Sequence, residues 1–381
     1  MYSEIIVDVN ESQTKVALLE DGELVEMYME HADRQSMTGN IYLGKVEKVV
    51  LGLQAAFIDI GYEKSAYLYM DDIINEHPLS SIYDVLTEGQ DIVVQVVKEP
   101  IGNKGPRVTT NITLPGKYFV LLPYMDYIGV SKKIESQEEQ ERLKKMVQDI
   151  RHKNMGLIIR TDAEGKEKSE LIRDFEFLLK LWDNIQNKRN IKSPDILYQD
   201  LNLLKRSVRD IFTDKIDKFV INDKNGYEEV REMVQVFCPS WKEKVEFFNK
   251  DCNIFQYYNI EGKLNKALGR KVWLKSGGYI VIDRLEALTA IDVNTGKCVY
   301  KENLEETVRL VNREAAREIA RQIRLRNIGG IIIIDFIDIM NYDQQEAVLN
   351  ELMHYLKRDR TKTTVMGITR LGLVEMTRKR R

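Results

Sequence analysis

The chain contains little cysteine, and none of its three cysteines has CxxC spacing from another. Cys238, Cys252 and Cys298 are odd in number and widely spaced, which argues against the disulfide framework of a small secreted domain. These features favour a reduced protein of the cytoplasm.

Long apolar runs are also missing. The longest candidate, GGIIIIDFIDIM at 329–340, is interrupted by acidic residues and falls short of the ~18 apolar residues that a membrane helix needs. The first residues lack the basic segment and the apolar core of a signal peptide, so we expect neither a signal peptide nor an integral membrane segment. The net charge is −3, so an RNA-binding site would have to be a local patch.

The first part of the chain is rich in strand patterns. Residues 1–35 alternate like a β-meander around a turn at Asp21–Gly22. Residues 36–112 hold short strands at even spacing with glycine turns, a pattern typical of a small closed barrel.

The remainder mixes strands with helices and predicts an α/β protein of several domains. Residues 113–200 include a long helical stretch at 166–189, and residues 201–270 alternate strand and helix patterns, with a turn expected at Asn225–Gly226. The last stretch, 271–381, predicts strand, strand, long helix, strand, helix and strand.

The most informative polar side chains lie in EALTAIDVNTGK at 286–297. Residues two apart in a strand share a face, so Asp292 and Asn294 are expected to point together. The next buried strand ends at Asp335, and the helix between the two strands predicts adjacent parallel strands. Because ligands in such sheets bind beyond the carboxyl ends of the strands, we expect these three side chains to meet at one edge.

Two carboxylates and an amide oxygen suit Mg²⁺, which prefers oxygen ligands and is commonly held by one or two carboxylates plus phosphate. The alternative is structural, because acids and asparagine also end strands and begin turns. An EF-hand loop does not fit, since the glycine of this segment is at the fifth place and Asn303 stands where glutamate would close the loop.

Longer blocks of sequence carry a resemblance to a known family. They are NIYLGKVEKVVLGLQAAFIDIGYEKSAYL, KEPIGNKGPRVTT, MGLIIRT, SGGYIVIDRLEALTAIDVNTGK, EAAREIARQIRLRNIGGIIIIDFIDIM and GITRLGLVEMTRKR. The chain resembles the catalytic region of the ribonuclease E/G family in these blocks, in the same order from its first residues to its last.

The resemblance implies an α/β multidomain architecture. An RNase H-like subdomain would be split between residues 1–35 and 203–268, with an S1 (OB-fold) RNA-binding barrel at 36–112 and a 5′-sensor region at 113–202 inserted into it. Residues 269–381 would form a DNase I-like catalytic subdomain.

The resemblance also implies a reaction. Asp292 and Asp335 match the family's two magnesium ligands, and Asn294 matches the asparagine that orients the first of them or the scissile phosphate. Single-stranded RNA would be hydrolysed endonucleolytically by a metal-activated water, leaving 3′-hydroxyl and 5′-phosphate ends. Mg²⁺ is the expected cofactor, with Mn²⁺ as a substitute, and precursors of ribosomal RNA or messenger RNA both fit as substrates.

Four barrel residues match the family's RNA contacts: Phe57, Tyr67, Lys98 and Lys104. The family usually has phenylalanine where Tyr67 stands, and tyrosine keeps the stacking surface. Without the resemblance, Phe57 would be assigned to the barrel core and Lys104 to a solvated hairpin tip.

The positions that match the family's 5′-monophosphate pocket are Gly116, Val120, Arg160 and Thr161. An arginine fork beside a hydroxyl can hold a phosphate, although a surface arginine in an ordinary turn has the same local sequence. Lys132 and Lys133 stand where better-known members carry two arginines, and lysine cannot make the bidentate contact. A weaker preference for monophosphorylated ends is therefore expected.

Two cationic segments have less specific patterns. The helix expected at 302–326 carries Arg309, Arg313, Arg317 and Arg321 in one stripe, and neighbouring glutamates favour a solvated, salt-bridged face over an RNA track. The terminal TRKRR is a cationic patch of a kind that is often disordered.

The sequence departs from better-known members in lacking the CPxC-type pair through which two subunits share a zinc ion, and the small dimerisation domain after it. Zinc binding is therefore not expected, and a homo-oligomer would not be built through a zinc link. Two other hypotheses stay open: an RNA-binding module without chemistry, and a metal-dependent DNase, against which the S1 barrel argues.

Overall fold

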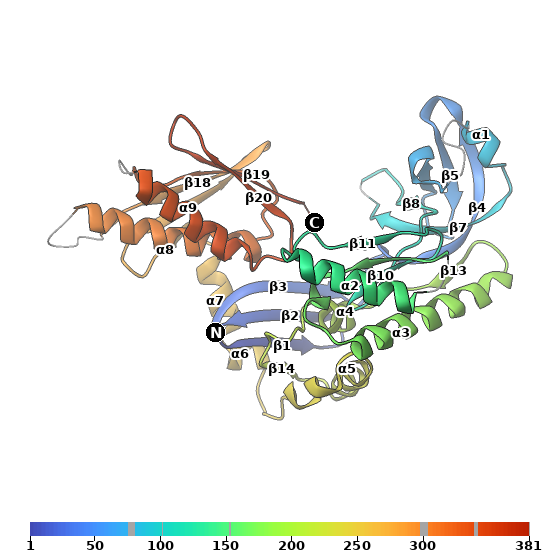
Figure 1. Ribbon diagram of the computed structural model, residues 1–381, viewed down its shortest axis with the longest axis horizontal. Helices are drawn as coiled ribbons and strands as arrows, with labels where there is room; N and C mark the ends of the chain where they lie inside the picture. The colour runs from blue at the N-terminus through green and yellow to red at the C-terminus, as the bar shows by residue number, and fades with distance from the viewer. Residues whose placement is uncertain (75–80, 101, 152–153, 298–303, 339–341, 381) are drawn as a thin grey trace.

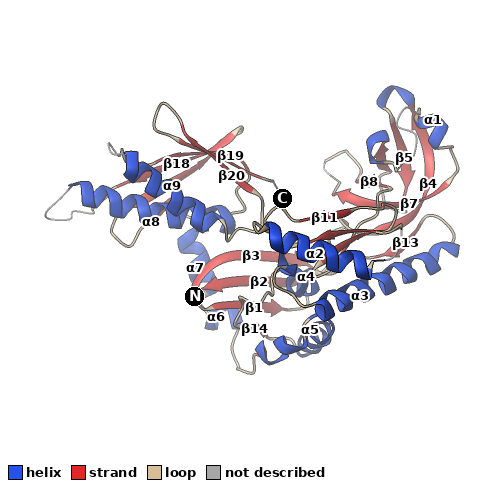
Figure 2. Ribbon diagram, viewed as in Figure 1, coloured by secondary structure: helices blue, strands red, loops and turns tan. Residues whose placement is uncertain are grey.

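The computed structural model describes residues 1–74, 81–100, 102–151, 154–297, 304–338 and 342–380. Figure 1 shows a closed barrel at one end of the molecule and a six-stranded sheet at the other, with a five-stranded sheet beneath the region between them. Figure 2 shows that helices lie on both sides of the five-stranded sheet and on one side of the six-stranded sheet. The architecture is therefore a mixed α/β arrangement of several units, as the sequence predicts.

The five-stranded sheet joins the beginning of the chain to a segment from its second half. In spatial order its strands are β15 (Val245–Phe247), β14 (Lys218–Ile221), β1 (Ser3–Val9), β2 (Gln13–Glu20) and β3 (Glu23–His31). β1, β2 and β3 are antiparallel, whereas β14 and β15 run parallel to β1. Asp21 and Gly22 have φ of 47° and 78° and make the tight turn expected between β2 and β3.

Helices cover both faces of this sheet. They are α4 (Leu203–Asp210), α5 (Lys224–Phe237), α6 (Ile254–Tyr257) and α7 (Ile260–Ala267), with the 3₁₀ segment η5 (Pro239–Lys244). The turn expected at Asn225–Gly226 is wrong, because both residues lie in the first turn of α5. The Asp223 carboxylate accepts a 2.6 Å hydrogen bond from the Gly226 N–H and caps the helix, so the chain continues as a helix there.

The barrel is built from five strands between Ile41 and Thr109. Its strands are β4 (Ile41–Val50), β5 (Ala55–Asp59), β6 (Ala66–Tyr69), β8 (Arg107–Thr109) and β7 (Asp91–Lys98), with η1 (Leu51–Leu53), η2 (Met70–Asp72) and α1 (Ile82–Val85) in the connections. Pairing of β4 with β7 closes the barrel, which fits an OB-type fold.

A four-stranded sheet follows the barrel. Its order is β11 (Ile128–Val130), β12 (Gly156–Ile159), β10 (Phe119–Leu122) and β9 (Leu114–Pro115). The helices α2 (Gln137–Ile150) and α3 (Lys168–Asn187), with η3 (Thr161–Ala163) and η4 (Lys188–Asn190), pack with it around one apolar core. β13 (Asp195–Tyr198) then returns to pair with β4. The long helix expected at 166–189 is thus confirmed.

The last unit is a six-stranded sheet with two helices on one face. Its order is β16 (Lys271–Trp273), β17 (Tyr279–Arg284), β18 (Leu288–Asn294), β19 (Gly330–Asp335), β21 (Val374–Arg378) and β20 (Thr363–Ile368). α8 (Leu304–Leu325) and α9 (Tyr342–Leu356) share one core with the alternate strand residues, so both helices lie on the same face, and the described part of the chain places no helix on the other face (Figure 2). β18 and β19 are adjacent and parallel, which confirms the βαβ prediction.

The end of the chain forms part of this sheet. β21 runs antiparallel between β19 and β20, and Arg378 is buried with its guanidinium on the Asp359 carboxylate at 2.7 Å. The expectation of a disordered basic end is therefore wrong for Thr377 and Arg378, which belong to a strand. Arg381 lies outside the described residues.

Buried ion pairs join the six-stranded sheet's unit to the rest of the molecule. Glu26 on β3 accepts hydrogen bonds from Arg324 of α8 and from Arg360, and the side chains of Glu26 and Arg324 are 7% and 6% exposed. Lys133 donates from Nζ to the carbonyls of Asp359 and Arg360 at 2.7 and 2.9 Å. Specific polar contacts, and not apolar packing alone, therefore hold the six-stranded sheet's unit against the rest of the molecule. Within the part of the chain that the structure describes, the helices are all too short or too polar to cross a membrane.

Candidate catalytic and RNA-binding sites

Asp292 and Asp335 lie directly opposite each other on the parallel strands β18 and β19. Neighbouring strands are about 4.8 Å apart, so both carboxylates are within reach of one small cation. Ile291 and Val293, on either side of Asp292, are buried against the helices, so Asp292 projects from the open face. The strand alternation assumed from the sequence therefore holds at this position.

Hydrogen bonding and charge couple the acids to their neighbours. Asn294 donates a 2.7 Å hydrogen bond from Nδ2 to Asp292 Oδ2, which fixes the orientation of that carboxylate. Burial raises the pKa of Asp335, and the charges of Asp292 and Asp338 raise it further. Asp338 was missed in the sequence, although the run DFID places it three residues after Asp335.

This donor set fits a hard divalent cation. Two carboxylates face each other across one strand spacing, Asn294 adds an amide oxygen, and a third carboxylate raises the negative charge of the same edge. A purely structural strand end does not require two acids in register, because like charges on opposite positions destabilise a sheet. Asp292 and Asp335 would be the ligands, with Asn294 as an orienting residue.

A buried asparagine in α8 positions the segment that follows β19. Asn312 is fully buried, donates from Nδ2 to the Ile337 carbonyl at 2.8 Å, and accepts from the Ile337 N–H at 3.1 Å. These two bonds fix the backbone between Asp335 and Asp338. The only sequence signal was one polar residue on the apolar face of a helix.

The aromatic residues expected to contact RNA lie side by side on the barrel. Phe57 of β5 and Tyr67 of β6 are directly paired, and each is half-buried between fully buried neighbours. Both side chains therefore point out of the barrel, and the assignment of Phe57 to the core is wrong. The Tyr67 and Tyr69 rings make an edge-to-face contact with centroids 5.4 Å apart.

Cationic residues flank this aromatic pair on both sides. Lys48 pairs with Phe57, Arg107 pairs with Tyr67, and Lys98 pairs with Arg107. These five side chains, one from each barrel strand, form a continuous row, called the barrel row below. Arg107 is held by Asp72 at 2.7 Å. Arg107 was missed because β8 pairs with β6 from a segment about 40 residues later in the chain, whereas Lys48 is in the neighbouring strand β4 and was overlooked. Lys104 is exposed in the segment before β8 and lies outside the row.

The second set of expected contacts lies at the start of the four-stranded sheet. Gly116 is buried, and a Cβ there would lie 2.6 Å from the Asp174 carboxylate. Asp174 is fully buried and accepts from the backbone N–H groups of Lys117, Tyr118 and Phe119. Burial raises the pKa of Asp174 despite these donors. Glycine is therefore required at position 116 so that this carboxylate can organise the turn.

Arg160 and Thr161 lie together on the same surface. The Arg160 guanidinium donates to the Gly116 carbonyl and to Asp210 at 2.7 Å, while the Thr161 hydroxyl is 2.8 Å from that of Ser131. The two hydrogen bonds that Arg160 donates, to Gly116 and to Asp210, use two of its five N–H groups. Val120 pairs with Ile158 on the neighbouring strand, and Ile158 is the one of the two that lines the adjacent cleft.

A cleft of about 1800 Å³ opens in front of these residues. Ile158, Arg160 and Thr161 line one side, and the segments around Arg360 and Arg380 line the other. Lys132 and Lys133 both line the cleft, and Lys133 also donates to the backbone carbonyls of Asp359 and Arg360. The two lysines are therefore not equivalent, since one carries a contact between units.

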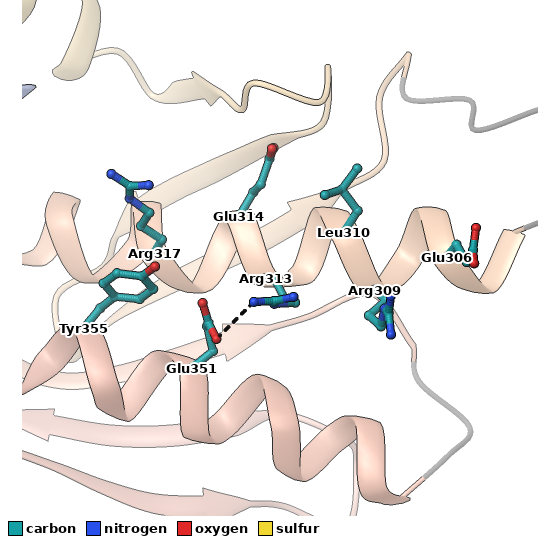
Figure 3. Close-up of a pocket in the computed structure, with 8 residues that line it drawn as sticks. All are labelled: Glu306, Arg309, Leu310, Arg313, Glu314, Arg317, Glu351 and Tyr355. Carbon is teal, nitrogen blue, oxygen red and sulfur yellow. Dashed lines mark ion pairs between the residues drawn. The ribbon is translucent and has the colours of Figure 1, made fainter.

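The arginine stripe of α8 divides between two environments. Arg309, Arg313 and Arg317 line a groove of about 450 Å³ between α8 and α9, where Arg313 lies 3.6 Å from Glu351 (Figure 3). Arg321 instead pairs with Glu318 and donates to the Leu24 carbonyl of β3. The predicted salt bridges are found at Arg313 and at Arg321, although Arg321 is largely buried, whereas Arg317 lies over the Tyr355 ring. The groove belongs to the helical layer, across the sheet from Asp292 and Asp335.

Comparisons with known proteins place the chain among relatives of one kind. The family model described as "Ribonuclease E/G family" matches residues 113–381. The chain is 43% identical to ribonuclease G of Escherichia coli K12 over 100% of its own length and 80% of that protein. It is 43% identical to ribonuclease G of Haemophilus influenzae over 99% of the chain and 79% of the relative. It is 39% identical to ribonuclease E of Nostoc sp. over 90% of the chain and 51% of that protein.

Proposed function

Because the chain belongs to the ribonuclease E/G family and is an endoribonuclease, we propose that it hydrolyses single-stranded RNA with Mg²⁺ held by Asp292 and Asp335. The observation that carries this proposal is the register of β18 with β19, which puts the two acids opposite each other. The products would be 5′-phosphate and 3′-hydroxyl ends. Processing of ribosomal RNA precursors and decay of messenger RNA are the roles proposed, in the cytoplasm.

The residues of the site have different roles in the proposed reaction. Mg²⁺, when bound, neutralises charge on a phosphoryl oxygen and lowers the pKa of a water molecule. Asn294 keeps the Asp292 carboxylate turned toward the open face through the 2.7 Å hydrogen bond. Asn312 holds the backbone after Asp335, so both carboxylates are positioned before the substrate arrives.

The topology supports the proposed identity of the subdomains. A sheet with three antiparallel strands followed by two parallel ones, as in β1–β3 with β14 and β15, suits an RNase H-like unit. The six-stranded sheet with two helices on one face would be the DNase I-like unit. The barrel would act as the S1 domain, with Phe57 and Tyr67 stacking on bases and Lys98 and Lys104 contacting phosphates.

The cleft beside Arg160 would receive the 5′ end of the RNA. Arg160 and Thr161 supply an N–H fork and a hydroxyl for a terminal phosphate, with Val120 and Gly116 shaping the turn beneath. Because the Lys133 ammonium is held by two backbone carbonyls, Lys133 would add its charge from a fixed position, and Lys132 is the lysine proposed to contact the phosphate directly. A modest preference for a 5′-monophosphate is proposed.

The test is cleavage of an A/U-rich, 5′-monophosphorylated oligoribonucleotide with and without Mg²⁺. We expect cleavage that EDTA abolishes, and a loss of roughly 100-fold or more in Asp292→Asn and in Asp335→Asn, as removal of several kcal/mol of charge stabilisation implies. Asp283→Asn is the matched control, because this acid is on the same sheet and pairs with Arg270 at 2.6 Å.

The outcomes separate the remaining alternatives. Wild-type rates in both aspartate variants would overturn the metal-site assignment. RNA binding without cleavage at any Mg²⁺ concentration would favour a non-catalytic module. Equal cleavage of a DNA oligonucleotide would favour a metal-dependent DNase.

A further inference from the structure

An aromatic pair lies exposed on the sheet face that carries the acids. Trp273 of β16 and Tyr279 of β17 are directly paired, with ring centroids 5.3 Å apart. Lys271 places its ammonium 4.1 Å from the Trp273 ring centroid and 3.4 Å from that of Tyr279. Trp273 remains 55% exposed with the lysine in this position, so much of its surface is open to a ligand.

This exposure contrasts with the other tryptophans of the chain. Trp182 and Trp241 are each 4% exposed and pack within the cores of their units. Trp273 contributes nothing to the core of its own sheet, because Val272 is the β16 residue that faces the helices. An exposed tryptophan that packs against a tyrosine and a lysine is typical of a binding surface.

The register of the sheet connects this pair to the acids. Tyr279 is the direct partner of Asn294, so Trp273, Tyr279 and Asn294 form one row across three strands. The adjacent row on the same face runs from Lys271 through Val281 to Asp292 and Asp335. Trp273 is therefore two strand spacings from Asn294, about 10 Å.

The barrel cannot supply this contact within one chain. Figure 1 shows the barrel strands β4 and β5 at the opposite end of the molecule from the sheet of β18 and β19. Phe57 and Tyr67 are on that distant barrel. Within one chain, residues of the six-stranded sheet itself are therefore placed nearer than the barrel to a nucleotide next to the scissile phosphate.

We propose that Trp273 and Tyr279 form a stacking site for the base of a nucleotide beside the scissile phosphate, with Lys271 pairing with the RNA backbone. The proposal rests on the proposed function and adds a substrate-positioning element to it. Aromatic rings bind any base by stacking, and a neighbouring ammonium adds attraction for a phosphate. The bound RNA would then cross the open face of the sheet from Trp273 and Tyr279 to Asp292 and Asp335.

Binding can be tested apart from cleavage by tryptophan fluorescence. In an Asp292→Asn background, addition of a short oligo(U) ribonucleotide should quench the emission, because Trp273 is the exposed tryptophan among the three. Trp273→Phe in that background should lose most of the quenching while RNA binding, followed by anisotropy, persists. Unchanged quenching in this variant would overturn the proposal.

Cleavage gives the second readout. Under single-turnover conditions Trp273→Ala should cut about 10-fold more slowly than the parent, and Trp273→Phe should retain most of the rate, as expected for loss of one stacked base. An abasic nucleotide scanned through the positions flanking the cleavage site should slow the parent at one position. At that position it should slow Trp273→Ala little further, because both changes remove the same contact.

A matched control is available elsewhere on the surface. Tyr257 of α6 is 51% exposed and has Lys250 3.7 Å from its ring centroid, so Tyr257→Ala removes a similar pair far from the acids. It should leave both readouts unchanged. Wild-type cleavage by Trp273→Ala, while Asp292→Asn is inactive, would refute the stacking site and leave the nuclease assignment intact. Full activity of Asp292→Asn would instead refute the proposed function.

Discussion

Asn312 and Ile337 are joined by two hydrogen bonds, which tie the middle of α8 to the backbone just after β19. The Asn312 side chain is fully buried, so its removal would leave the N–H and carbonyl of Ile337 without this partner. The position of Asp335 thus depends on a helix that comes before it in the chain and on a side chain that does not touch the open face.

Asn312→Leu is expected to slow RNA cleavage roughly 100-fold, because a small displacement of a catalytic group has a large effect on rate. The free energy of unfolding should fall by about 1–3 kcal/mol, since both polar groups of Ile337 lose their partner. Gln322→Leu is the control: Gln322 is equally buried in α8 and donates to Glu318 at 2.7 Å, farther along the helix. Equal loss of activity in both variants would mean that α8 acts only through stability.

The barrel row predicts separable effects on RNA affinity. Phe57→Ala and Tyr67→Ala should each weaken binding of single-stranded RNA by about 1–3 kcal/mol, because each removes a stacking surface that points outward. Lys98→Ala and Lys48→Ala should lower the slope of log K against log salt by ~0.7 each. Fluorescence anisotropy over a salt series measures both, with Tyr83→Ala in α1 as the control. Unaltered affinity in both aromatic variants would remove the barrel row from the RNA site.

Arg160 predicts a change in the response to the 5′ end of the substrate. Arg160→Lys keeps a positive charge but loses the fork, so the ratio of cleavage rates for 5′-monophosphorylated and 5′-triphosphorylated RNA should fall by about 10-fold. Cleavage of RNA with a 5′-hydroxyl should be unaffected. Arg151→Lys changes a second arginine of this region, which pairs with Asp126, and should leave the ratio unaltered. A ratio unchanged in Arg160→Lys would exclude the cleft as a sensor.

Glu26 predicts a dependence of stability on pH. Burial alone would raise the pKa of Glu26, but Arg360, Arg324 and the Tyr28 hydroxyl outweigh it and lower the pKa. A carboxyl whose folded pKa is depressed contributes stability above its unfolded pKa and loses it as the pH falls through the folded value. Glu26→Gln should therefore reduce stability by about 3–5 kcal/mol at pH 7, because two buried arginines lose their charge partner.

The same variant should differ less from the parent in acid. Below about pH 5 Glu26 begins to be protonated in the unfolded chain, so the difference between parent and variant shrinks as the pH falls further. Thermal unfolding at several pH values measures it. Glu11→Gln, at an exposed glutamate in the β1–β2 turn, should show no such difference at any pH. A constant difference for Glu26→Gln would mean that packing, and not charge, is lost.

Local patterns in the sequence were enough to predict that Asp292 and Asp335 lie together, but not to predict the residues that hold the surrounding backbone in place. Strand alternation and the βαβ connection put Asp292 beside Asp335, because both rules act over short stretches of chain. The hydrogen bonds of Asn312 with Ile337, and of Lys133 with the Asp359 carbonyl, join residues that are far apart in sequence. No local sequence pattern predicts them. The antiparallel insertion of β21 between β19 and β20 has the same origin.

Position 226 shows how a local rule is overridden. An Asn–Gly pair predicts a turn, yet the Asp223 side chain caps a helix at that point and α5 then buries an apolar face on the sheet. The sequence TRKRR likewise suggests a frayed end. In the structure, however, Arg378 is buried against Asp359, which lies between α9 and β20.

The register between β18 and β19 sets how freely this chain can change length. Residues added to or removed from the turn around Asn327, where φ is 47°, can be absorbed outside the sheet. A single deletion inside β19 would rotate every later side chain to the other side, burying Asp335 among the helices and presenting an isoleucine or phenylalanine in its place. Insertions and deletions among related chains should therefore gather in the connections and spare these two strands.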